Sequence, residues 1–191
     1  MKLAGSNPHM NWFTTFSILL AAFLIVFGQA LFHGVRKLLG TQLDLLPALM
    51  VYTALSANLA TVTVLALFGG LSADSLSANP LGVSILPLFV CGLGVYLYRD
   101  LILREQVFAQ VALGLLASSV TPLSTLLLLL TLGSNPLLGW GTFWQLAAMA
   151  FGGAAATPVL FELFGVFDRF LGRPPAAESS FRPDREIRRG R

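Results

Sequence analysis

The 27 residues from Leu45 to Leu71, LLPALMVYTALSANLATVTVLALFGGL, contain no Asp, Glu, Lys or Arg. A helix needs about 18 or more apolar residues without charge to cross a hydrocarbon layer about 30 Å thick. One helix of this length would extend about 40 Å, which is more than a single crossing requires. A polar, small-residue patch, Ser56-Ala57-Asn58, lies near its middle. We therefore expect two short spans, 45–55 and 59–71, joined by a tight turn, and one long tilted helix is the alternative.

The chain as a whole has few charges with which to face water. Of its 191 residues, 11% are charged and 55% are hydrophobic, and the mean hydropathy is +0.77. An ordinary soluble domain has about 25% charged residues. Long stretches without charge lie between Lys2 and Arg36, Asp44 and Asp74, Asp74 and Arg99, and Glu105 and Glu162. This pattern excludes a soluble globular enzyme and predicts a polytopic membrane protein.

Four further apolar segments flank the 45–71 stretch and predict the remaining spans. They cover Trp12–Phe32, Pro80–Tyr98, Gln106–Leu132 and Leu138–Val166. Pro80 suits the first position of a helix, Pro122 is expected to kink the span that contains it, and residues 72–79 are expected to form a polar loop. The first segment is longer than the core of a signal peptide, so we expect a retained span. The predicted fold class is all-α, a polytopic membrane helix bundle of about six spans over residues 1–172, with five spans as the alternative.

Basic residues are distributed unequally between the two sides of the predicted bundle. With six spans, both chain ends lie on the side that carries ten of the twelve Lys and Arg residues, and the other side carries Arg36 and Lys37. The positive-inside rule then places both ends in the cytoplasm and the protein in the cell inner membrane. With five spans only the carboxyl end stays there. Residues 173–191 contain six Arg and predict a disordered basic tail on the cytoplasmic side. Such a tail meets anionic lipid or an acidic partner, or simply marks the cytoplasmic side, rather than binding nucleic acid.

The sequence offers little for catalysis or for metal and cofactor binding. It has no Gly-x-Ser-x-Gly, His-Glu-x-x-His or phosphate-binding lysine motif. Its single cysteine, Cys91, and its two histidines, His9 and His33, do not form a metal-ligand set. No carboxylate lies at the centre of a predicted span, where a coupled pump would be expected to place one. We therefore expect a protein that is not an enzyme and that has no catalytic residue, metal or cofactor.

Small residues recur at helical spacing in the last predicted span. Ala148, Gly152 and Ala156 follow one another at intervals of four, and Gly114 and Ser118 repeat this spacing in the preceding span. Within lipid, helices associate where small residues allow their backbones to approach closely. These stripes either pack the protein's own spans together or dock another membrane helix, and both interpretations stay open.

Residues 68–82 read FGGLSADSLSANPLG, in which a glycine-rich span end leads into a Gly-Leu-x-x-Asp element, a short polar stretch and Pro-x-Gly. Gly70, Asp74, Pro80 and Gly82 occupy the fixed positions of this pattern. The stretch resembles the signature of the rod shape-determining protein MreD family. Chain length, span count and span order from about residue 12 to residue 172 agree with that resemblance.

The resemblance implies a non-enzymatic scaffold of the cell-wall elongation complex that supports peptidoglycan synthesis and rod shape. Its implied partners are MreC and, through it, the RodA glycosyltransferase and a class B penicillin-binding transpeptidase. The implied fold is similar to that of the substrate-binding subunits of energy-coupling-factor transporters. From the residues themselves, we expect Asp74 to cap or stiffen the turn into Pro80, and Gly82 to admit a neighbouring backbone.

A second hypothesis is a small-molecule-binding membrane subunit of a vitamin-type transporter. It follows from the similar size, span count and implied fold. Such a protein should carry a polar pocket on its outer side. The predicted outer loops, 34–41, 72–79 and 133–139, are short and poor in aromatic residues, which favours the scaffold instead.

Overall fold

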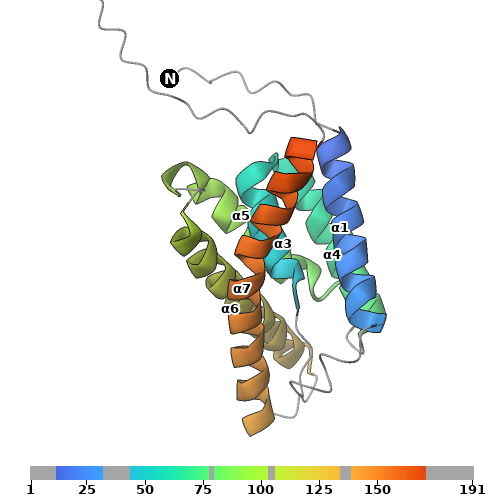
Figure 1. Ribbon diagram of the computed structural model, residues 1–191. Helices are drawn as coiled ribbons and strands as arrows, with labels where there is room; N and C mark the ends of the chain where they lie inside the picture. Colours follow the sequence, from blue (N-terminus) through green and yellow to red (C-terminus); the bar gives the residue numbers. More distant parts are fainter. Residues whose placement is uncertain (1–11, 32–43, 78–79, 103–105, 134–138, 171–191) are drawn as a thin grey trace, which may run out of the picture.

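The computed structural model describes residues 12–31, 44–77, 80–102, 106–133 and 139–170, and these form an all-α bundle (Figure 1). The described residues contain six α-helices and a short 3₁₀ turn, η1. Their bounds are α1 Trp12–Leu31, α3 Leu46–Ser56, α4 Leu59–Leu76, α5 Ile85–Tyr98, η1 Arg99–Leu101, α6 Val107–Thr131 and α7 Trp140–Phe170. The predicted fold class is confirmed. The predicted tail, residues 173–191, lies outside the described residues.

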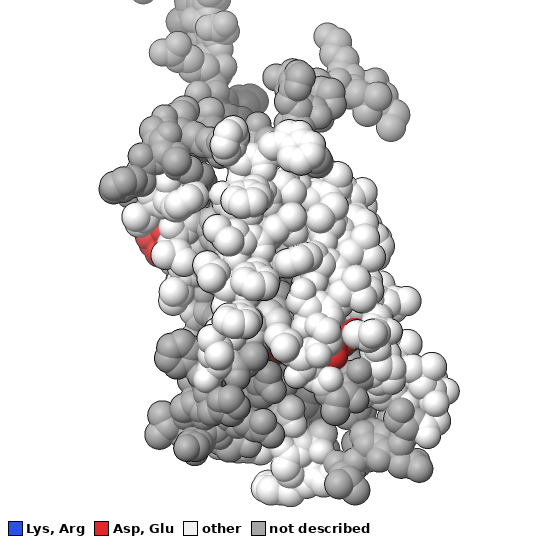
Figure 2. Space-filling view, turned by 90° about the vertical axis from the view of Figure 1, so that its right-hand side faces the viewer, with Lys and Arg blue, Asp and Glu red and all other residues white. Residues whose placement is uncertain are grey.

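The outer surface of the bundle is the surface of a membrane protein. Helices α1, α4, α6 and α7 are each long and apolar enough to cross a bilayer. Large apolar side chains such as Phe13, Phe16 and Trp140 are mostly exposed. Figure 2 views the side of the bundle on which α1 and α4 lie, and no Lys or Arg is visible among its described residues. A soluble protein rarely exposes an apolar surface of this extent, so the bundle is embedded in lipid.

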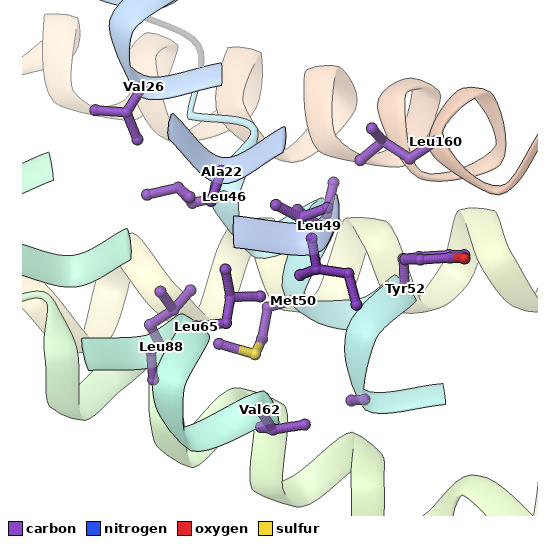
Figure 3. Packing of buried hydrophobic residues seen from close by; sticks show 14 of the residues in the cluster. Ala22, Val26, Leu46, Leu49, Met50, Tyr52, Val62, Leu65, Leu88 and Leu160 are labelled. Carbon is purple, nitrogen blue, oxygen red and sulfur yellow. The ribbon is translucent and has the colours of Figure 1, made fainter. Parts of the chain in front are cut away.

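The short helix α3 lies at the centre of the bundle. It packs against α1, α4, α5, α6 and α7, and all ten of its residues from Leu46 to Leu55 are buried. Figure 3 shows side chains of the surrounding helices gathered around Leu49, Met50 and Tyr52. The Tyr52 ring stacks on Phe164 of α7 with a centroid distance of 4.4 Å. Because it is enclosed on all sides, α3 has no polar face, and this explains why its sequence is continuously apolar.

The predicted break in the 45–71 stretch is confirmed. Helix α3 ends at Ser56, Ala57 and Asn58 are extended, and α4 begins at Leu59. Leu46, at the start of α3, contacts Gly69 near the end of α4, so the two helices form an antiparallel hairpin. The alternative of one long tilted helix is wrong.

The start of α1 and the end of α7 lie at the same end of the bundle. Figure 1 shows the first turn of α1 and the last turns of α7 side by side, opposite the end where α4 leads into α5. An even number of passes through the bundle produces this arrangement. Four of the described helices are long enough to cross a bilayer, and α3 and α5, with 11 and 14 residues, are shorter than a full crossing. The count of six spans, with five as the alternative, therefore stays a prediction.

Two predicted boundaries around residues 72–80 are wrong. Helix α4 continues through Ser72 and Ser75 to Leu76, and both serine hydroxyls donate to carbonyl groups of their own helix. Helix α5 begins at Ile85 and not at Pro80. Residues 80–84 instead form turns in which Gly82 has a φ of +94°.

Candidate functional site

Asp74 lies in the last turns of α4 and is the best-connected carboxylate of the described chain. Its side chain is only 1% exposed. One carboxylate oxygen, Oδ2, accepts hydrogen bonds from the backbone N–H groups of Gly82 (2.8 Å) and Ser84 (3.1 Å), and the other, Oδ1, accepts one from the Ser84 hydroxyl (2.5 Å). Both N–H groups belong to the turn that leads into α5, where a negative charge is favourable. Asp74 therefore ties the end of α4 to the start of α5.

The motif residues Gly70, Pro80 and Gly82 lie in or against the turn that Asp74 binds. Gly82 has a φ of +94°, which a residue with a side chain adopts only with strain. Gly70 lies against α5, because a Cβ placed on it would be 2.9 Å from the Cα of Ile85. Pro80 is exposed, and its carbonyl accepts a hydrogen bond from Val83 N–H (3.4 Å).

The roles that we expected of Asp74 and Gly82 differ in part from those in the structure. Asp74 stiffens the turn as expected, but it binds the N–H groups just before α5, which begins at Ile85 and not at Pro80. The close backbone approach belongs to Gly70, and Gly82 is required by the backbone conformation. Ser84 completes the cluster, which we did not predict. A Ser immediately before an apolar helical run is a usual helix-start signal and could have identified it.

The small residues of α6 and α7 hold these two helices together. A Cβ on Gly114 would overlap Thr157, and a Cβ on Gly153 would overlap Ser118. Gly114 and Ser118 therefore pack the protein's own spans together, which is one of the two interpretations of the small-residue stripes. Of the predicted stripe on α7, Ala156 packs against the main hydrophobic cluster, whereas Ala148 and Gly152 are half-buried. Docking of another helix on them stays a prediction.

A cavity of about 260 Å³ lies beside the Asp74 turn, at the end of the bundle opposite the start of α1 and the end of α7. Its described lining comes from the start of α3, α5 and α7, from the ends of α4 and α6, and from the residues just before α3 and α5. The lining residues with polar side chains are Asp44, Ser84, Thr121, Thr125, Thr142 and Gln145. The remainder of the described lining is mostly leucine and other apolar residues. Most of the described lining is helical, so the length of the predicted outer loops does not indicate this cavity.

Asp44 is the charged residue in this lining. It is half-buried just before α3, and its Oδ1 accepts a hydrogen bond from the Leu46 N–H (3.0 Å). Burial raises the pKa of the Asp44 carboxyl, and the bond from Leu46 opposes this rise in part. The described residues contain no group of three or more His, Cys, Asp or Glu that could hold a metal ion.

Arg99 defines the opposite end of the bundle. Its guanidinium lies 4.3 Å from the centre of the Tyr96 ring, and its Nη1 donates to the carbonyl of Ala57 in the α3–α4 turn (3.3 Å). Its Nε is 3.7 Å from a carboxylate oxygen of Asp100, which is almost fully exposed. These contacts fix η1 against the α3–α4 turn.

No family model, no curated protein and no solved structure matches the chain. The resemblance to the MreD family and the similarity to transporter subunits therefore stay predictions from the sequence.

Proposed function

We propose that this chain is a non-enzymatic membrane scaffold of a cell-wall elongation complex, as members of the MreD family are. The proposed partners are MreC and, with it, RodA and a class B penicillin-binding transpeptidase. The observation that carries the proposal is the turn built by Asp74. Asp74 is hydrogen-bonded to Gly82 and Ser84, and Gly70, another residue of the motif, packs closely against Ile85 beside them.

The fold is compatible with a protein that acts by binding other membrane proteins. The described helices expose broad apolar faces to lipid, and α6 and α7 already associate through small residues. A fixed α4–α5 turn presents one defined surface at its end of the bundle. The proposed location is the cell inner membrane, with both chain ends in the cytoplasm and the Asp74 turn on the outer side.

Co-purification with MreC tests this proposal directly. The full chain and tagged MreC are co-expressed, extracted in mild detergent, and recovered through the tag. We expect the wild type to be recovered and the Asp74→Ala variant to be inserted in the membrane but recovered at least fivefold less well. Glu162→Ala, which removes an exposed carboxylate of α7, is the matched control and should behave as wild type. Failure to recover the wild type contradicts the scaffold, and full recovery of Asp74→Ala limits Asp74 to a role within the fold.

The cavity favours a second candidate function, a small-molecule-binding membrane subunit such as those of vitamin-type transporters. Its position beside the start of α3 and the Asp74 turn is the outer side in the proposed orientation. At about 260 Å³ it lies just below the range of about 300–1,000 Å³ that is typical of ligand pockets. Direct ligand binding, described below, distinguishes this candidate from the scaffold.

A further inference from the structure

The cavity beside the Asp74 turn has a polar side and an apolar side. Asp44 and Thr121 contribute to the polar side, and Leu126, Leu129 and Met149 contribute apolar surface. A ligand that fits such a lining carries one polar group and a short apolar part. A cavity of about 150 Å³ holds a molecule of the size of benzene, so about 260 Å³ admits a somewhat larger one.

The carboxylate of Asp44 decides which charge the polar group of a ligand should carry. Among the described residues that line the cavity, Asp44 is the charged one, and no Lys or Arg is in the set. Its one hydrogen bond among the described residues comes from Leu46 N–H, which leaves acceptor capacity on both oxygens. Among the described residues this half-buried carboxylate has no cationic partner, and such a group favours a positively charged ligand and disfavours an anion.

Thr121 belongs to the polar side of the lining, but its hydroxyl is not open to a ligand. The residue is 4% exposed, and its hydroxyl oxygen is buried beside the thiol of Cys91 on α5, a weak hydrogen-bonding group. The charge of the described lining therefore comes from Asp44.

We propose that this cavity binds a small molecule that carries a primary ammonium group and a short apolar chain. The ammonium lies against Asp44, and the chain lies along the leucines of α6 and Met149 of α7. This inference rests on the second candidate function. A free amine and the headgroup of an ethanolamine lipid share this chemistry.

The test titrates the full-length protein in detergent with n-hexylammonium, and uses n-hexanol and n-hexanoate as probes of equal chain length. We expect saturable binding of hexylammonium, at least tenfold weaker binding of hexanol, and no binding of hexanoate. Asp44→Asn keeps an acceptor for Leu46 N–H but removes the charge, and it should weaken hexylammonium binding at least tenfold. Glu162→Gln, the matched control, should bind as the wild type does.

The outcomes distinguish the ammonium inference from the small-molecule function on which it rests. Equal binding of hexanol and hexylammonium, or equal binding by wild type and Asp44→Asn, overturns the ammonium inference but leaves a small-molecule site. Absence of binding by all three probes overturns the small-molecule function as well. In nanodiscs, competition by phosphatidylethanolamine but not by phosphatidylglycerol supports the lipid as the source of the ammonium. If neither lipid changes hexylammonium binding, the result supports a free amine as the source of the ammonium.

Discussion

Asp74 and Asp44 lie at the same end of the bundle, and the fold uses them differently. Asp74 is 1% exposed, and both of its oxygens accept hydrogen bonds from the turn before α5. Asp44 is half-buried, and among the described residues it accepts one bond, from Leu46 N–H. A buried carboxylate needs bonds to offset its lost hydration. The first carboxylate is fully committed to structure, whereas the second retains capacity for a ligand.

Replacing Asp74 should have a far greater effect on stability than replacing Asp44. Asp74→Ala leaves the N–H groups of Gly82 and Ser84 without their acceptor, and hydrogen bonds to a charged group contribute about 1.5–3 kcal/mol each. We expect a loss of roughly 3–5 kcal/mol in the free energy of unfolding, against about 1 kcal/mol or less for Asp44→Ala. Denaturant titration in detergent, followed by tryptophan fluorescence, measures both. Similar losses for the two variants would contradict the different uses of these carboxylates.

Gly70 tests whether the turn needs its close packing as well as its hydrogen bonds. A Cβ at this position lies 2.9 Å from backbone atoms of Ile85, which can move only if α5 moves. We expect Gly70→Ala to cost roughly 2–3 kcal/mol.

Gly92→Ala is the matched control for Gly70→Ala. Its Cβ would meet the flexible side chain of Met50 and a methyl group of Val62 at similar distances. Since Met50 can adjust its rotamer, the loss should be smaller than that of Gly70→Ala. Melting temperatures in detergent compare the two variants, and an equal decrease would show that the position of α5 is not the limiting constraint.

Gly82→Ala should have a smaller effect again. A Cβ there would meet only ordinary contact with Ile85 at 3.9 Å, so the penalty comes from the φ of +94°. For an alanine this conformation costs roughly 1–2 kcal/mol. Gly82→Asn should recover part of the loss, because Asn tolerates this region better than Ala. Equal stability of the Ala and Asn variants would indicate that the turn rearranges.

The sequence predicts the parts of this end that are local. Length and the Ser56–Asn58 patch predicted the α3–α4 break, and the spacing of Asp74 before a turn predicted its structural role. The end of α4 was missed because Ser72 and Ser75 read as loop residues, although their hydroxyls bond within the helix.

The cavity was not predictable from local pattern. Asp44, Thr121 and Gln145 belong to different segments and come together only because five helices surround α3 and leave space at its start. Each of these residues is unremarkable in its own stretch of sequence. Their shared lining follows from helix packing, which periodicity does not specify.

The pH dependence of stability tests the environment of Asp44 by itself. Burial holds the pKa of Asp44 in the folded protein above its ordinary value of 3.8, so the folded state binds the proton more tightly than the unfolded state. The stabilisation from protonated Asp44 is therefore present at low pH and is lost as the pH rises through the folded-state pKa. Asp44→Asn lacks this dependence and keeps an acceptor for Leu46 N–H. At pH 7 it should be as stable as wild type or slightly more stable, by at most about 1 kcal/mol.

Melting temperatures of wild type and Asp44→Asn between pH 4 and pH 8 measure this difference. The two curves should approach each other, or cross, as the pH falls. A variant less stable than wild type at pH 7 would mean that the ionised Asp44 already has a favourable partner in the folded chain. The acceptor capacity that the cavity offers to an ammonium would then be occupied, whereas a variant of equal or higher stability leaves that capacity to a ligand.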